Sequence, residues 1–382
     1  MRVSSITKVA VLATAAVVAI APSAVAYDLT SAGATSVSTF LEKCKTSYQA
    51  DTKDTLSHAG GGSGTGKTAI NAGTKDMAFS DSANTAAPAG VFHIPAAVWP
   101  IGIAYNLNNS SSKQLQLSGP TIAKIFAGTI SRWNDPAIVA DNNRSTTVIT
   151  YKKNADGTLK KDAKGDPIVL SSRVIKSNFI LPAKKIQVIY RSDSSGTTEN
   201  FTNYLNKSAP SVWTKAKNKV FASSFPGNIN DVANLGRIVG AASSTGVAQL
   251  AGKTPYSITY AEVNYATANK LKIANVINPA GNSVVPNSAG VGAFLASATQ
   301  DANGFLTYDY ATKEKGAYPL GIVSYLLADT KYPDAAKAKA VKEFANYILS
   351  TKCSKDVGGA LGFSVIDGEL LKKSLAQVAK IG

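Results

Sequence analysis

The chain has 382 residues, enough for two domains, and its 45% hydrophobic content with dispersed glycine and proline excludes a disordered protein. Its net charge of +16 predicts attraction to anionic cell-envelope polymers or to nucleic acid. Nucleic acid is not expected as a partner, because the lysines are dispersed and no zinc-finger or aromatic-basic motif appears in the sequence.

The first 26 residues are typical of an export signal. Arg2 and Lys8 precede an apolar run, Val9–Ile20, that is too short to span a bilayer, and an A-x-A cleavage motif ends at Ala26. Removal of residues 1–26 takes away two basic and no acidic residues, so the charge falls to +14. No cysteine follows the small residues and no later stretch has the length of a membrane span. We therefore expect an exported protein that is extracellular, cell-envelope associated or periplasmic, without a lipid anchor here.

The two cysteines, Cys44 and Cys353, would lie in an oxidising compartment. They could form one disulfide between an early and a late helix, and two buried free thiols are the alternative. The two histidines, His58 and His93, have no cysteine near them, so we expect no zinc site.

Two turns of small residues open helices in the first hundred residues. Residues 31–36 lead into an amphipathic pattern, and the glycine-rich run Gly60–Lys67 leads into a second helix. Met77–Asp81 is a short apolar strand that ends in a carboxylate.

The glycine-rich run also satisfies the phosphate-binding pattern G-x-x-x-x-G-K-[ST], through Gly61, Gly66, Lys67 and Thr68. A nucleotide-using enzyme is therefore one alternative. The preceding residues 54–59 are not the apolar strand that the motif requires, and the export signal directs the chain away from ATP. Backbone N–H groups in the run could still bind an anion.

The middle of the chain contains a strand, a helix and an insertion. Phe92–Asn106 is rich in β-forming residues and is predicted to cross from one domain to the other, and Ser118–Phe126 is predicted to be a helix with proline in its first turn. Tyr151–Asn178 carries two turn signals and many lysines, and predicts a surface hairpin.

A strand, a turn and a helix follow at residues 186–205. The apolar run Ile186–Ile189 leads into the turn Arg191–Thr197, and a helical pattern begins at Phe201. The N-terminus of a helix favours an anion, and Arg191 adds a full charge beside it. Asp193 could orient the guanidinium by an ion pair.

The remaining elements continue the alternation of strands and helices. Gly236–Leu250 with Tyr256–Tyr260 predicts a helix–strand pair, Tyr318–Leu327 a returning strand and Asp334–Leu349 an amphipathic helix. The alternation predicts an α/β fold.

Four segments together resemble the phosphate-binding proteins of bacterial ABC-type phosphate importers: Ala32–Thr35, Gly62–Gly66, Ser80–Asp81 and Arg191–Thr197. The segments Ile125–Pro136, Tyr318–Leu320 and Leu361–Phe363 are similar to that family as well. The resemblance covers nearly the whole mature chain in order, although the Tyr151–Asn178 insertion has no counterpart in the simplest members.

The resemblance implies a two-lobed, type II periplasmic-binding-protein fold with a ligand cleft between the lobes. The lobes would be residues 27–103 with 319–382, and residues 104–318, with hinges near Ile103–Asn106 and Tyr318–Gly321. It also implies an ABC permease in the membrane as partner. We expect no cofactor and no metal, and no catalysis either, because no general base placed beside a nucleophile is evident.

The residues implied to bind phosphate share small or charged side chains at strand ends: Thr35, Ser36, Ser63, Asp81, Arg191, Ser195, Gly196 and Thr197. Asp193 would pair with Arg191. At Ser36 the family often has phenylalanine, so the serine is expected to supply its N–H but to remove a wall of the pocket.

Asp81 is predicted to select the anion. Phosphate at neutral pH keeps a proton that a carboxylate can accept, whereas sulfate has none and would leave a buried carboxylate facing an oxyanion. The alternative to a transport protein is a secreted or cell-surface structural or adhesive protein that keeps this fold, which the basic surface and the lysine-rich insertion would suit.

Overall fold

The computed structural model describes residues 26–108, 113–176 and 179–382, so the predicted export signal lies outside the described residues except for Ala26. Strands and helices alternate in this part of the chain, which confirms the α/β prediction. Across the same residues, no helix combines the length and apolar character needed to cross a membrane.

The strands are β1 Asp28–Gly33, β2 Thr55–Gly61, β3 Met77–Ser80, β4 Val91–Asn106, β5 Gln116–Ser118, β6 Ser145–Tyr151, β7 Val169–Lys176, β8 Gln187–Arg191, β9 Ile238–Ala241, β10 Ser257–Glu262, β11 Lys272–Ile277, β12 Ser283–Val284, β13 Thr299–Gln300, β14 Leu306–Thr307 and β15 Gly321–Asp329. The α-helices are α1 Ser38–Thr52, α2 Ser63–Asn71, α3 Gly119–Phe126, α4 Pro136–Asn142, α5 Gly196–Ser208, α6 Phe221–Ser224, α7 Ser243–Lys253, α8 Val263–Ala268, α9 Ser288–Leu295, α10 Ala335–Leu349 and α11 Gly368–Val378. A 3₁₀ turn η1, Thr35–Val37, precedes α1, and a π-helical turn η2, Thr351–Gly358, follows α10.

Eleven of the described strands form one continuous sheet, whose main path runs β2-β1-β3-β15-β4-β10-β8-β9. Strands β1, β2 and β3 are parallel to one another, and so are β8, β9 and β10. Parallel strands end at the same edge of a sheet, so each group places the residues after its strands together.

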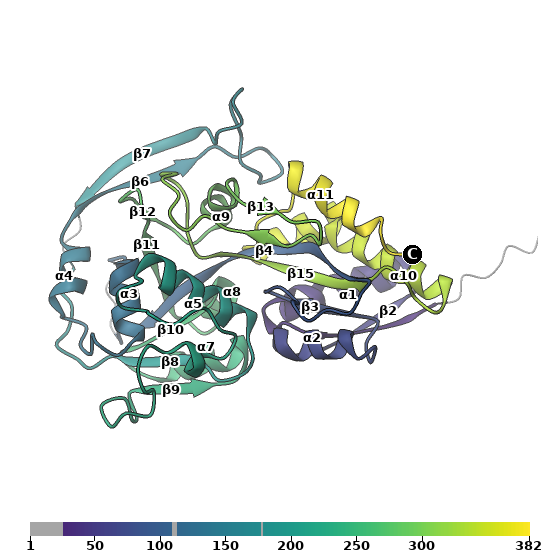
Figure 1. Cartoon of the computed structure of the whole chain (residues 1–382). Coiled ribbons are helices and arrows are strands. Elements are labelled where there is room, and N and C mark those ends of the chain that lie inside the picture. Colours follow the sequence, from purple (N-terminus) through teal and green to yellow (C-terminus); the bar gives the residue numbers. More distant parts are fainter. Residues whose placement is uncertain (1–25, 109–112, 177–178) are drawn as a thin grey trace, which may run out of the picture.

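The strand β4 joins the two halves of the molecule. Its first part pairs with β15 as far as Pro100, and its second part, from Ile101 on, pairs with β10 and β11. All but its last residue are buried, because α10 and α11 pack near its start and α7 and α8 near its end. Figure 1 shows β4 running between the body that holds β1–β3 and the body that holds β8–β10. The prediction of a crossing strand at Phe92–Asn106 is confirmed within one residue.

The predicted insertion forms an arm. Within the described residues, strands β6 and β7 pair only with each other, in antiparallel register. Figure 1 shows the arm arching over α9 toward α11. Its first strand begins at Ser145, six residues earlier than the predicted start at Tyr151, because the threonine-rich residues 145–150 pair with β7.

Two further segments add detail to the predictions. The residues 54–59 were judged not to be an apolar strand, and residues 55–61 form β2, a largely polar edge strand whose pairing partner within the described residues is β1. The segment Gly236–Leu250 contains β9 as well as a helix, since Ile238–Ala241 lies parallel to β8 before α7 begins.

A disulfide joins Cys44 of α1 to Cys353 of η2, across 309 positions of sequence. Both cysteines are fully buried beside Phe40, whose ring packs edge-on against Phe363. The covalent link therefore closes the lobe to which both ends of the described chain contribute.

We predict that the double substitution Cys44→Ala with Cys353→Ala lowers the free energy of unfolding by about 2–5 kcal/mol, because the unfolded chain regains the freedom of a very long loop. Urea denaturation under non-reducing conditions measures the change. A reducing agent should lower the wild-type midpoint and leave the double variant unchanged. Equal midpoints for the two proteins without reductant would contradict the prediction.

Candidate functional site

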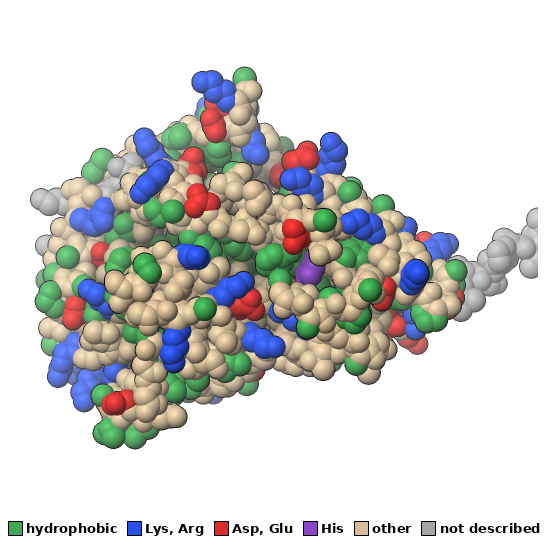
Figure 2. Space-filling view, viewed as in Figure 1, with side chains coloured by type: hydrophobic (Ala, Val, Ile, Leu, Met, Phe, Trp, Pro, Cys, Tyr) green, Lys and Arg blue, Asp and Glu red, His purple; other side chains and the backbone are tan. Residues whose placement is uncertain are grey.

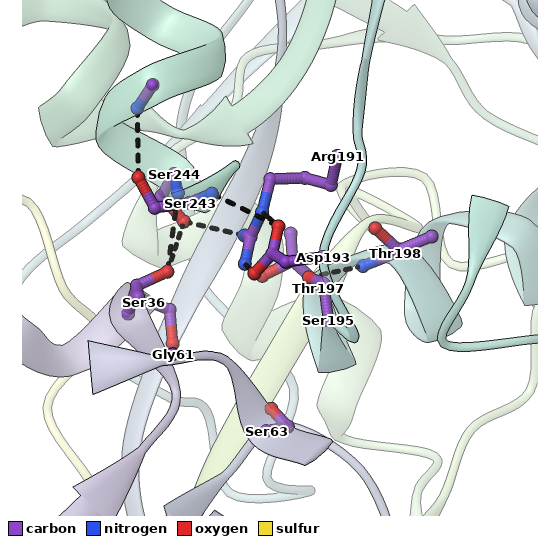
Figure 3. A network of polar contacts seen from close by, with 12 residues as sticks. Ser36, Gly61, Ser63, Arg191, Asp193, Ser195, Thr197, Thr198, Ser243 and Ser244 are labelled. Atoms are coloured by element: carbon purple, nitrogen blue, oxygen red, sulfur yellow. Dashed lines mark hydrogen bonds and ion pairs between the residues drawn. The ribbon is translucent and has the colours of Figure 1, made fainter. Parts of the chain in front are cut away.

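The predicted site residues meet between the two lobes. Thr35 and Ser36 follow β1, Ser63 begins α2, and Asp81 follows β3, whereas the residues 191–197 follow β8 on the other lobe. Figure 3 shows Ser36 and Ser63 on the chain of the first lobe, facing Arg191, Asp193, Ser195 and Thr197 on the second. The structure thus brings residues more than a hundred positions apart into one polar cluster.

Arg191 is the charged centre of the cluster, and it is only 2% exposed. Its Nε and Nη2 donate to the two carboxylate oxygens of Asp193 at 2.7 and 2.6 Å, and its Nη1 donates to Ser244 Oγ at 2.9 Å. Burial raises the pKa of Asp193, but the hydrogen bonds from Arg191 outweigh it and hold this pKa below its ordinary value. Asp193 therefore stays ionised and fixes the plane of the guanidinium.

The N-terminus of α5 lies beside this arginine. Ser195 caps the helix, since its Oγ accepts from the N–H of Thr198 at 3.1 Å. Gly196 is the first helical residue, and a Cβ there would lie 2.5 Å from Ser63 Oγ and 2.8 Å from Asp81 Cβ. Only glycine lets the positive end of α5 approach the first lobe this closely.

Asp81 lies on the first lobe and is 2% exposed. Ser36 Oγ lies 2.8 and 2.9 Å from its two carboxylate oxygens, and the backbone N–H of Asp81 donates to Ser63 Oγ at 3.0 Å. Burial, followed by the negative charge of Glu262, raises the pKa of Asp81 to about 6. The carboxyl group is thus poised to share a proton near neutral pH.

Several contacts join the lobes without any ligand. Tyr265 Oη donates to the carbonyl oxygen of Thr35 at 2.6 Å, and Asn200 Nδ2 donates to the carbonyl oxygen of Asp81 at 2.6 Å. The N–H of Gly64 donates to the carbonyl oxygen of Ser194 at 3.2 Å. These contacts join the two halves of the site in the arrangement that the structure shows.

Sequence reasoning missed five residues of the cluster: Asn200, Ser244, Tyr260, Glu262 and Tyr265. Ser244 had a recognisable signal, since Ser243–Ser244 follows β9 and opens α7 just as the predicted residues follow β1 and β8. Tyr260 accepts the N–H of Arg191 at 3.1 Å and contacts Thr198 Oγ1 at 2.7 Å. Ser36 was expected to contribute only its N–H, and in the structure its hydroxyl also holds Asp81.

The glycine-rich run, a possible metal site and the cavity under the arm do not share the polar cluster around Arg191 and Asp81. Lys67 of the glycine-rich run lies 2.7 Å from Ser82 Oγ and 3.9 Å from Glu199. Within the described residues, no three side chains of the metal-binding types gather into a metal site. A cavity of about 480 Å³ lies between the arm, α9 and α11, and none of the predicted site residues lines it.

The pKa of Asp81 predicts a pH-dependent effect of Asp81→Asn on stability. The native pKa of Asp81, about 6, exceeds the unfolded value of 3.8. Below about pH 4 the carboxyl group is protonated in the native state, so its ionisation does not lower the free energy of unfolding. Above about pH 6 it is ionised in both states, and the free energy of unfolding is lowered by the full amount. Asparagine cannot ionise, so the stability of the variant relative to wild type should rise by up to about 3 kcal/mol between about pH 4 and about pH 7. Urea denaturation of both ligand-free proteins across this range measures it, and a difference that is constant with pH would contradict it.

Comparison with known proteins agrees with this geometry. The PBP superfamily domain matches residues 18–352 of the chain. Phosphate-binding protein PstS 3 of Mycobacterium tuberculosis is 34% identical over 311 residues, which are 78% of this chain and 71% of that protein.

Solved structures show the same fold. The periplasmic phosphate-binding protein PfluDING, solved with phosphate, has a TM-score of 0.63 at 21% identity, over 91% of this chain and 93% of that one. An ABC-type phosphate transport receptor from Vibrio cholerae has a TM-score of 0.50 at 14% identity, over 88% of this chain and 99% of that one. The fold is therefore the two-lobed, type II periplasmic-binding-protein fold, and the chain belongs to the PstS family of phosphate-binding proteins within the PBP superfamily.

Proposed function

We propose that this protein captures inorganic phosphate between its lobes and delivers it to an ABC permease for import. The observation that supports the proposal most directly is the opposition of Arg191 and Asp81, both nearly inaccessible to water and on different lobes. The relatives are named as phosphate-binding proteins, and the Vibrio cholerae protein as a phosphate transport receptor.

The proposed ligands divide into two groups by their task. Arg191 and the N-terminus of α5 attract a tetrahedral anion, because a guanidinium and free helical N–H groups both favour negative charge. The hydroxyl and N–H groups of the remaining proposed ligands would complete its hydrogen bonds: Thr35, Ser36, Ser63, Ser195, Gly196 and Thr197. Asp81 accepts the proton that phosphate carries and sulfate lacks, so it rejects sulfate.

The domain division and the hinge belong to the same proposal. The pairing of β4 passes from β15 to β10 at Pro100–Ile101, and Tyr318 Oη donates to the carbonyl oxygen of Ile101 at 2.7 Å. A hinge at Ile103–Asn106 and Tyr318–Gly321, between lobes of residues 27–103 with 319–382 and residues 104–318, lies beside this point. Opening there would let phosphate enter, and closure would remove it from water.

We propose an exported, periplasmic or extracellular location, which the signal-like N-terminal sequence supports. Figure 2 shows lysines and arginines scattered over the face in view rather than gathered in one patch. The relatives favour transport over a purely structural or adhesive role, and they are binding proteins rather than enzymes.

Isothermal titration of the purified protein with phosphate and with sulfate tests the function. We expect the wild type to bind phosphate and to discriminate strongly against sulfate, by up to about 10⁴-fold. Asp81→Asn should reduce this ratio, because an uncharged amide no longer repels sulfate. Equal binding of both anions by the wild type, or binding of neither, would refute the proposal, and an unchanged ratio in Asp81→Asn would refute the role of Asp81.

Closure of the two lobes around phosphate should depend on the size of the side chain at position 64. A Cβ at Gly64 would overlap the side chain of Ser194 on the opposite lobe, so Gly64→Ala should weaken phosphate binding by about 10-fold or more through loss of the closed state. Gly359→Ala is a matched control, because Gly359 has helical backbone angles and a Cβ there would meet nothing within 4 Å. If Gly64→Ala binds phosphate as tightly as the control, the lobes do not close in this way.

A further inference from the structure

Ser244 is a buried hydroxyl residue of the cluster that is not among the proposed phosphate ligands. It is the second residue of α7, and its side chain is 0% exposed. Its Oγ accepts from Arg191 Nη1 at 2.9 Å, and Figure 3 shows it facing the guanidinium. The same Oγ lies 3.3 Å from Thr35 Oγ1 on the opposite lobe. Ser244 therefore contacts both the charged centre of the second lobe and a proposed ligand of the first.

Arg191 determines which way the Ser244 hydroxyl points. A guanidinium has donors only, so its N–H occupies a lone pair of the serine Oγ, and the serine proton must point elsewhere. Among the described residues, the acceptor within hydrogen-bonding distance of that hydroxyl is Thr35 Oγ1. If Thr35 donated to Ser244 instead, the buried serine proton would be left without an acceptor, which is costly. The favoured direction is therefore from Ser244 to Thr35.

The Thr35 hydroxyl is left as a donor by these contacts. Its oxygen accepts the backbone N–H of Ser244 at 3.3 Å as well as the serine hydroxyl, and an oxygen with both lone pairs occupied can only donate. Both contacts are long, so they orient the hydroxyl more than they stabilise the closed form. Tyr265 Oη holds the backbone of the same residue, because it donates to the carbonyl oxygen of Thr35 at 2.6 Å. The proton of the Thr35 hydroxyl thus remains available for an anion.

A fixed donor has two consequences for an anion in the site. A hydroxyl that is oriented beforehand loses less rotational freedom when the anion binds, so more of its hydrogen bond appears as affinity. A hydroxyl that cannot accept also gives no partner to a protonated oxygen of the ligand, so the P–O–H group of phosphate is directed away from Thr35 and toward Asp81. Because Thr35 and Ser244 lie on different lobes, this orientation arises only when the lobes approach each other.

We propose that Ser244 is a positioning residue for phosphate binding, which holds the Nη1 side of Arg191 and turns the proton of the Thr35 hydroxyl toward the anion as the lobes close. The proposal rests on phosphate being the ligand. It goes beyond the proposed ligands because Ser244 acts through two of them and needs no contact of its own with phosphate.

The variants Ser244→Cys and Ser244→Thr test the hydroxyl, since both keep an atom at the γ position and only threonine keeps an O–H group there. A thiol donates and accepts weakly, so we expect Ser244→Cys to bind inorganic phosphate about 10-fold more weakly than wild type, and Ser244→Thr to stay within about threefold of it. Isothermal titration of the full chain measures both. Equal affinities of the two variants would overturn the proposal, whereas a wild type that does not bind phosphate would instead refute the proposed function.

A double-variant cycle tests the link to Thr35. Once Thr35→Val has removed the threonine hydroxyl, Ser244→Ala has less left to disturb, so the combined loss of phosphate affinity should be smaller than the product of the two single losses by at least about threefold. A merely structural Ser244 would give losses that multiply, and that result would overturn the proposal. Ser257→Ala is the control, because Ser257 is equally buried at the start of β10, where its hydroxyl donates to the carbonyl oxygen of Ala251 at 2.9 Å. It should bind phosphate as the wild type does.

Discussion

The site depends on keeping one guanidinium charged in a place that water hardly reaches. Removing Arg191 from water is expensive, and an ion pair alone repays such a cost only when its hydrogen bonds are well placed. Asp193 takes two of the donors of Arg191, and the N–H of Ser243 in turn donates to Asp193 Oδ1 at 3.1 Å, so the carboxylate is held from both sides. The elements around the pair are arranged to support it: β8 supplies the arginine, β9 and α7 supply Ser243, and β10 supplies the phenol of Tyr260.

The groups that attract an anion and the carboxylate proposed to select phosphate over sulfate lie on different lobes. Arg191 and the positive end of α5 belong to the second lobe, while Asp81 belongs to the first. These groups are far apart in sequence, so they can act on one anion only after the chain has folded. An anion can settle on Arg191 in an open form, but its proton content matters only when Asp81 approaches. The hydroxyl of Thr197 lies where the lobes meet, 3.3 Å from Asp81 Oδ2 and 2.7 Å from Glu262 Oε1, so it separates two carboxylates that would otherwise repel.

Much of this arrangement could be predicted, because the relevant signals are local. A strand followed by small residues and a helix marks an anion-binding turn, and this pattern identified the segments that contain Thr35, Ser63 and Arg191. The alternation of elements gave the fold class, and the β-rich stretch at Phe92–Asn106 gave the strand that joins the lobes. Resemblance to a known family then suggested that these segments share one ligand.

The remaining contacts of the site depend on distances in the folded chain that cannot be read from the sequence. Tyr265 and Glu262 look like ordinary residues at the end of a strand and in a short helix, and only the folded chain shows one bonded to Thr35 and the other to Thr197. The strand β2 was missed because its residues are polar, and an edge strand that pairs on one side alone tolerates polar residues. Ser36 was judged by the side chain that it replaces, although the hydroxyl that it gains has a partner of its own.

The link between Cys44 and Cys353 also changes how mechanical load would travel through the molecule. Both ends of the described chain lie outside the segment that the disulfide closes, whose two cysteines are 309 positions apart. Tension applied at the ends would pass from one cysteine directly to the other, so the second lobe and the strands between the lobes would carry none of it. The site residues from Ser63 to Thr197 lie within this segment and are shielded from traction on the termini, whereas Thr35 and Ser36 precede Cys44 and remain on the loaded path.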